Sequence, residues 1–85
     1  MSEELPSAEW EQRTSSIWSL VRAELARAER RHPAMRTPHE GYAVILEELD
    51  ELWAEIKRDE GRSQFAISEA VQVAAMAMRY ILNLT

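Results

Sequence analysis

Hydrophobic residues recur at intervals of three and four along most of this chain, which is the spacing of one face of an α-helix. In the first part of the chain they are Trp10, Ile17, Val21, Leu25 and Ala28. Ser7 stands before this pattern as an N-cap residue, and His32 ends it because the residue before a proline is disfavoured in the helical conformation. We therefore predict a first helix from about Ser7 to Arg31.

The start of a second helix is marked by residues that favour helix initiation. Thr37 is the N-cap, Pro38 takes the first helical position, and Glu40 follows three residues after the cap. Helical spacing continues to about Asp59, and Gly61 is a residue type that commonly ends helices. We therefore predict a second helix from Pro38 to about Asp59.

A third helix is expected from Ser63, which can serve as its N-cap, to near the C-terminus. Residues 70–78 of this helix are apolar nearly all round, so the helix should be buried on several sides. A three-helix monomer cannot cover this surface together with Trp10 and Trp18 of the first helix. We therefore expect a helical-bundle oligomer, either a homodimer or a tetramer.

Composition narrows the fold class and the kind of protein. The 85 residues make one domain, residues 1–85, and the presence of only two glycines and three prolines favours an all-α fold. The absence of cysteine excludes disulfides, thiolate metal sites and a cysteine nucleophile. The net charge of −5 argues against broad nucleic-acid binding. Residues 1–8 hold no apolar run and no stretch approaches the length of a membrane span, so we expect a soluble cytoplasmic protein without a membrane partner.

Carboxylates three residues apart form the most distinctive chemical pattern. Glu48 and Glu51 share one face of the second helix, and Glu69 and Gln72 share one face of the third. If the two helices pack antiparallel, three carboxylates and one amide oxygen converge between them. Such an all-oxygen group suits Mg²⁺ or Mn²⁺, cations that bind phosphate-bearing substrates.

Two simpler explanations compete with a metal site. The acidic arc of the second helix could be a solvated face, although like charges at this spacing repel one another and lysines are not interleaved. Its members are Glu40, Glu47, Glu48, Glu51 and Glu55. Glu69 lies in an otherwise apolar helix and needs a partner, and that partner could be an arginine such as Arg79 or Arg36.

The two halves of this pattern, Glu47-Glu48-x-x-Glu51 and Glu69-x-x-Gln72, resemble the signature of the all-α nucleoside triphosphate pyrophosphohydrolases, the MazG-like family. That signature reads Glu-Glu-x-x-Glu and, on the next helix, Glu-x-x-Asp. The resemblance covers roughly residues 38–84, and Gln72 departs from it where the family has aspartate. It implies a three-helix MazG-like domain that hydrolyses a nucleoside triphosphate to the monophosphate and pyrophosphate.

The resemblance also implies roles for individual residues. The metal ligands would be Glu48, Glu51, Glu69 and Gln72. Glu47 would orient or deprotonate the attacking water as a catalytic residue. Arg79 and Asn83, or an arginine between Arg22 and Arg36, would contact the substrate. Glutamine at position 72 removes one negative charge from the ligand set, so the expected affinity for Mg²⁺ is lower than in the family.

Two other functions remain open. A MazG-like fold that no longer catalyses would act as a small helical interaction module, and the glutamine at position 72 supports that interpretation. An acidic helical protein that mimics nucleic acid or binds a basic partner is supported only by the net charge.

Overall fold

The computed structural model describes residues 7–85, and this part of the chain is all-helical. Helix α1 covers Ala8–Arg31, α2 covers Pro38–Asp59 and α3 covers Gln64–Leu84. The described residues contain no strand, so the all-α prediction is confirmed. Residues 1–6 lie outside the described range. Part of the single-domain prediction and of the localisation prediction rests on them.

Each helix begins at the N-cap that the sequence predicts. The Ser7 hydroxyl accepts a hydrogen bond from the Trp10 amide at 3.1 Å. The Thr37 hydroxyl accepts a hydrogen bond from the Glu40 amide at 3.1 Å, and the Ser63 hydroxyl accepts one from the Ala66 amide at 3.2 Å. These bonds satisfy amide groups that have no partner within the first turn of a helix.

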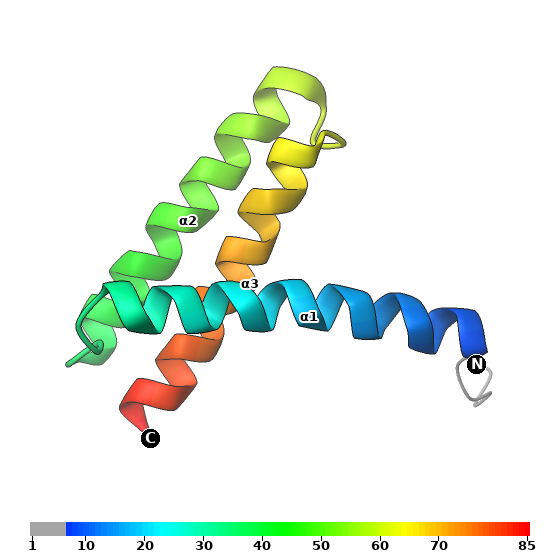
Figure 1. Cartoon of the computed structure of the whole chain (residues 1–85). Coiled ribbons are helices and arrows are strands. Elements are labelled where there is room, and N and C mark those ends of the chain that lie inside the picture. The colour runs from blue at the N-terminus through cyan, green and yellow to red at the C-terminus, as the bar shows by residue number, and fades with distance from the viewer. Residues whose placement is uncertain (1–6) are drawn as a thin grey trace, which may run out of the picture.

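Helices α2 and α3 form an antiparallel pair joined by a short turn (Figure 1). The chain leaves α2 through two residues with left-handed backbone conformation, Glu60 at φ 68° and Gly61 at φ 77°. At the other end of the pair the Tyr80 side chain of α3 lies directly against Gly41 of α2. A Cβ atom at Gly41 would lie 2.5 Å from Cδ2 of Tyr80, so a larger residue there would clash with α3.

Helix α1 crosses α3, and its N-terminal half projects beyond the α2–α3 pair (Figure 1). The core at this crossing consists of Val21 and Ala28 from α1 and Ala75 and Met76 from α3. These side chains are mostly small, and no large side chain of the described residues is fully buried. A core of this size gives a single copy of the chain little hydrophobic stabilisation.

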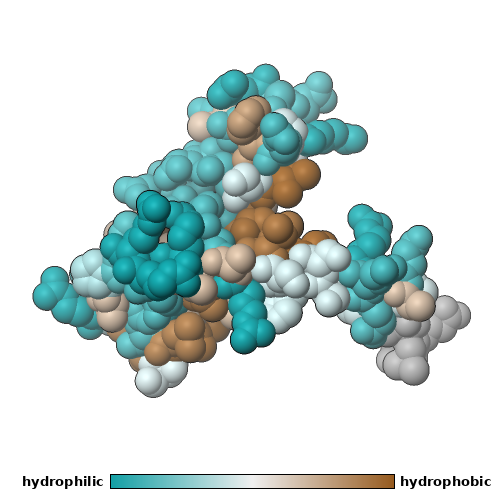
Figure 2. Space-filling view, in the orientation of Figure 1, coloured by the Kyte–Doolittle hydropathy of each residue, from teal (hydrophilic) through white to brown (hydrophobic). Residues whose placement is uncertain are grey.

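Many large apolar side chains remain exposed. On α2 they form one stripe with helical spacing, composed of Tyr42, Leu46, Leu49 and Trp53. Figure 2 shows further hydrophobic surface where α3 emerges from behind α1, next to hydrophilic surface over α2. The half-buried side of α2 is a different stripe, in which Ile45 and Leu52 alternate with Glu48 and Glu55. The acidic arc of α2 is therefore not simply a solvated face.

Helix α3 is long and apolar enough to cross a membrane by length and composition alone. The sequence-based expectation that no stretch approaches such a length therefore does not hold for α3. The core helix of a soluble protein passes the same test, and α3 packs against both other helices. Cytoplasmic localisation stays a prediction.

Candidate metal centre

Three carboxylates converge between α2 and α3. Glu48 and Glu51 lie one turn apart on α2, and the antiparallel packing brings Glu69 of α3 beside them. One carboxylate oxygen from each residue can be chosen so that all three lie within 4.8 Å of one another. Oxygen donors from two helices thus meet at one point, as the spacing of the acidic residues predicts.

Glu48 and Glu69 are half-buried and Glu51 is exposed, and none of the three has a basic partner. No ion pair among residues 7–85 includes Glu48, Glu51 or Glu69. The Oε2 atom of Glu69 is buried and has no hydrogen-bond partner. Neither of the alternative arginine partners pairs with Glu69, because Arg79 pairs with Glu29 instead and no ion pair among residues 7–85 includes Arg36. An unpaired carboxylate oxygen in this position is costly unless a proton or a cation compensates it.

The electrostatics of the group follow from this crowding. Burial, followed by the charges of Glu51 and Glu69, raises the pKa of Glu48 to about 6. Burial and the neighbouring Glu51 also raise the pKa of Glu69. Burial and mutual repulsion thus raise the pKa of both groups and make their charged forms less favourable than in an isolated glutamate.

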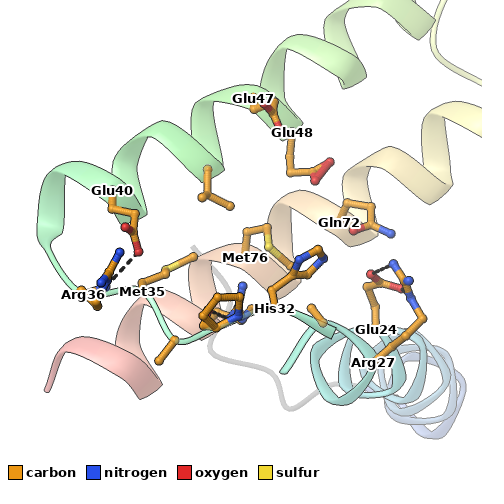
Figure 3. Close-up of a pocket in the computed structure, with 15 residues that line it drawn as sticks. Glu24, Arg27, His32, Met35, Arg36, Glu40, Glu47, Glu48, Gln72 and Met76 are labelled. Atoms are coloured by element: carbon orange, nitrogen blue, oxygen red, sulfur yellow. Dashed lines mark hydrogen bonds and ion pairs between the residues drawn. The ribbon is translucent and has the colours of Figure 1, made fainter. Parts of the chain in front are cut away.

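A pocket of about 370 Å³ adjoins these carboxylates and shares Glu48 with them (Figure 3). It lies between the end of α1, the loop of residues 32–37, and the facing sides of α2 and α3. Arg36 and Met35 lie near Glu40 at one end of it, and Arg27 lies beside Glu24 at the other (Figure 3). His32 and the apolar Met76 lie between these two ends. Cationic side chains, acidic side chains and an apolar wall thus surround one cavity.

The remaining motif residues also line this pocket. Glu47 is exposed and stands beside Glu48, but it is not one of the three converging carboxylates. Gln72 lies between Glu48 and Glu24 of α1 in Figure 3. Its role as a fourth oxygen ligand, and the catalytic role of Glu47, stay predictions.

Arg79 and Asn83, which the sequence suggested as substrate contacts, hold the loop after α1 to the end of α3. The Arg79 side chain is 3% exposed, pairs with Glu29 and donates a hydrogen bond from Nη2 to the Pro33 carbonyl at 3.0 Å. The Asn83 Oδ1 atom accepts a hydrogen bond from the Met35 amide at 2.7 Å. We call these two residues and their partners the loop clasp. The contacts give both side chains a structural task, and a substrate contact by either remains a prediction.

Glu24 is the pocket residue that the sequence pattern did not single out. It lies three residues after Val21 and four before Ala28, both of which are buried, so helical spacing places it on the side of α1 that faces α3. Arg27 binds its carboxylate, with Nε donating to Oε1 at 2.8 Å. An acidic residue on the apolar stripe of a helix is the signal that could have identified it.

Comparison of the chain with protein-family models, with curated proteins and with solved structures finds no match. The likeness to the MazG-like family therefore rests on the residue pattern alone.

Proposed function

We propose that this protein is a metal-dependent nucleoside triphosphate pyrophosphohydrolase of the MazG-like type. The observation that carries the proposal is the convergence of Glu48, Glu51 and Glu69 without a basic partner. The donor set is all oxygen, and one buried carboxylate oxygen of Glu69 lacks a hydrogen-bond partner. Both properties fit Mg²⁺ or Mn²⁺.

In this proposal Glu48, Glu51 and Glu69 hold the cation, with the amide oxygen of Gln72 as a neutral fourth donor. The bound cation supplies charge neutralisation at the phosphates and activation of water. Glu47, at the edge of the pocket, orients the attacking water and accepts its proton. Water adds to the α-phosphorus, the bond from this phosphorus to the oxygen that bridges to the β-phosphate breaks, and pyrophosphate leaves with that oxygen.

The pocket supports a phosphate-bearing substrate. Arg27 and Arg36 line it at opposite ends, each beside an acidic residue, so a polyphosphate chain could bind arginine at one point and the metal centre at another. The apolar wall at Met35 and Met76 offers contact area for the nucleoside. We assign phosphate contact to Arg27 and Arg36 in preference to Arg79, because Arg79 is engaged in the loop clasp.

Assembly into a homodimer or tetramer belongs to the same proposal. The exposed stripe on α2 and the projecting half of α1, with Ile17 and Trp18 exposed, offer more apolar surface than a monomer normally carries. We expect light scattering at micromolar concentration to give a mass of at least two chains. Leu49→Asp, in the middle of the α2 stripe, should shift the protein toward monomer, whereas a monomeric wild type would contradict this part of the proposal.

The direct test is a hydrolysis assay with purified protein, Mn²⁺ or Mg²⁺ and a panel of ribo- and deoxyribonucleoside triphosphates. We expect slow release of pyrophosphate and the monophosphate in equal amounts. Glu51→Gln should lower this rate by about 100-fold or more, as loss of a metal-site residue does. The matched control is Glu9→Gln, an exposed residue on α1, which should keep the wild-type rate. Equal rates in wild type and Glu51→Gln would contradict the proposal.

The second candidate is a non-catalytic MazG-like interaction module. It is favoured by Gln72, which removes one charge from the motif and lies beside Glu24 at the contact between helices. Under this alternative the protein would assemble through its apolar faces, but neither Mg²⁺ nor Mn²⁺ would bind and no nucleotide would be hydrolysed.

A further inference from the structure

The loop of residues 32–37 forms one end of the pocket and carries two of the residues assigned above to substrate binding. These are Met35, which is 3% exposed, and Arg36, which is exposed. Both line the pocket near Glu40 (Figure 3). Loops are usually more mobile than the helices that they connect, so binding side chains on a loop need support from a rigid scaffold.

Helix α3 holds the backbone of this loop at two residues. Nη2 of Arg79 donates a hydrogen bond to the Pro33 carbonyl at 3.0 Å, and the Met35 amide donates one to Oδ1 of Asn83 at 2.7 Å. Arg79 is itself fixed by its ion pair with Glu29 of α1. The loop is therefore tied to a helix that is not one of the two helices it connects.

Helix α2 holds the next residue of the loop. The Arg36 amide donates a hydrogen bond to Oε1 of Glu40 at 3.0 Å. The backbone of residues 33–36 is thus bound at three points by side chains of two helices. A movement of Met35 or Arg36 away from the pocket breaks at least one of these bonds. The loop is ordered when the protein folds, so a ligand that contacts it does not have to order it on binding.

We propose that Asn83 is a positioning residue for the substrate: it holds Met35 in place as the wall against which the nucleoside binds. The inference rests on the function proposed above. Asn83 is not among the residues that line the pocket, so its effect on a ligand passes through the Met35 backbone. The residue that the sequence suggested as a substrate contact thus acts on the substrate through another residue.

This role predicts a difference between the two parts of the substrate. Met35 belongs to the apolar wall assigned to the nucleoside, whereas Arg36 keeps its own hydrogen bond with Glu40 when Asn83 is replaced. Arg27, the other arginine assigned to phosphate, lies at the opposite end of the pocket (Figure 3). Loss of the Asn83 hydrogen bond should therefore weaken binding of the nucleoside and leave binding of the phosphates nearly unchanged. A protein that is merely less stable would bind both parts less well.

The test is calorimetric titration of the full chain with two probes in the presence of Mn²⁺. One is the α,β-methylene analogue of ATP, in which the bond to be hydrolysed is replaced, and the other is inorganic tripolyphosphate. Asn83→Leu should raise the Kd for the ATP analogue by about tenfold, and the Kd for tripolyphosphate by less than about twofold. Asn83→Asp keeps an oxygen acceptor for the Met35 amide and should bind the analogue within about threefold of wild type.

Val21→Ala is the matched control for stability. Val21 is buried where α1 crosses α3 and does not line the pocket, so this variant should melt at a lower temperature but keep the wild-type ratio of the two Kd values. Asn83→Ala also lacks the acceptor and replaces Asn83→Leu in the comparison if the leucine variant does not fold.

The outcomes separate this inference from the proposed function. If the variant without the acceptor changes both Kd values alike, or neither, the role of Asn83 is wrong and the metal centre is unaffected. If it selectively weakens the analogue while Glu51→Gln hydrolyses nucleotide at the wild-type rate, the proposed reaction fails and the role of Asn83 in binding stands. If the wild type binds neither probe, the proposed function and this inference fail together.

Discussion

Two charged residues of α3, Arg79 and Glu69, lie at contacts between helices, and their surroundings are opposite in kind. Near its C-terminal end, Arg79 is almost completely buried and is satisfied by Glu29 and the Pro33 carbonyl. Ten residues earlier, Glu69 meets two further carboxylates and keeps one buried oxygen without a partner. The pKa of Glu29 is lowered, mainly by Arg79, whereas the pKa of Glu69 is raised.

This difference separates a polar cluster whose charges are paired from one whose charges are not. The loop clasp satisfies its own charges and stabilises the fold without any ligand. The carboxylate group of Glu48, Glu51 and Glu69 has an excess of negative charge, and we propose that a cation compensates it. The predictions below test whether the two clusters differ in this way.

The largest loss of stability is expected from breaking the loop clasp. Arg79→Met keeps an apolar side chain of similar length but leaves Glu29 and the Pro33 carbonyl without their partner. The free energy of unfolding should fall by about 2–3 kcal/mol. For a domain of this size the melting temperature should then fall by roughly 10–20 °C.

Arg58→Met is the control for this substitution, because Arg58 forms an exposed ion pair with Glu55 at 3.6 Å and its side chain is 71% exposed. It should cost less than about 1 kcal/mol. Equal losses in the two variants would show that the loop clasp does not stabilise the fold.

A smaller loss of stability is expected from adding a negative charge to the carboxylate group. Gln72→Asp places a fourth carboxylate beside Glu24 and Glu48, and should lower the metal-free stability by about 1–2 kcal/mol. Saturating Mn²⁺ should reverse this loss, and it should stabilise the variant more than it stabilises wild type. Gln64→Asp, in the first turn of α3, is the matched control. It should not be destabilising, because an acid is favourable at a helix N-terminus.

The smallest effect is a pH dependence of the metal-free protein. Because the fold raises the pKa of Glu48 from 4.5 to about 6, the protonated form is favoured in the folded state. The resulting stability is complete below pH 4.5 and is lost as the pH rises through 6. We expect the free energy of unfolding to fall by at most about 1 kcal/mol between pH 5 and pH 7.5.

Glu48→Gln should reduce this slope in thermal unfolding curves, and the raised pKa of Glu69 contributes a slope of the same sign. The lowered pKa values of Glu24, Glu29 and Asp59 act in the opposite direction, since their stabilisation is lost only as the pH falls. These groups stay ionised between pH 5 and pH 7.5 and do not contribute there. An unchanged slope in Glu48→Gln would contradict the assignment to Glu48.

Local signals in the sequence predict the helices well. Thr37 and Ser63 cap α2 and α3 as expected, because a cap depends only on residues within one turn. The convergence of Glu48 and Glu51 with Glu69 was also predictable. It requires only helical spacing and an antiparallel turn of a few residues.

Contacts between distant parts of the chain were not predictable in the same way. Arg79 and Glu29 are 50 residues apart. No residue close to Arg79 in the sequence indicates that the end of α1 lies beside the C-terminal part of α3. The angle at which α1 crosses α3 also decides which acid of α1 lines the pocket, so the apolar stripe marks Glu24 as an unusual acid but does not place it in the pocket. The exposure of Leu49 and Trp53 has the same origin, because one apolar stripe of α2 has no partner among residues 7–85.

The central claim is that the carboxylates of α2 and α3 form a metal centre, and thermal unfolding with and without Mn²⁺ at pH 7.5 tests it most directly. At ten times its Kd, Mn²⁺ should raise the melting temperature of wild type by roughly 5–10 °C. Glu69→Gln should melt at least as high as wild type without metal, because it removes an unpaired charge, and should show no shift with Mn²⁺. A wild type that does not respond to Mn²⁺, or an equal shift in Glu69→Gln, would contradict the claim.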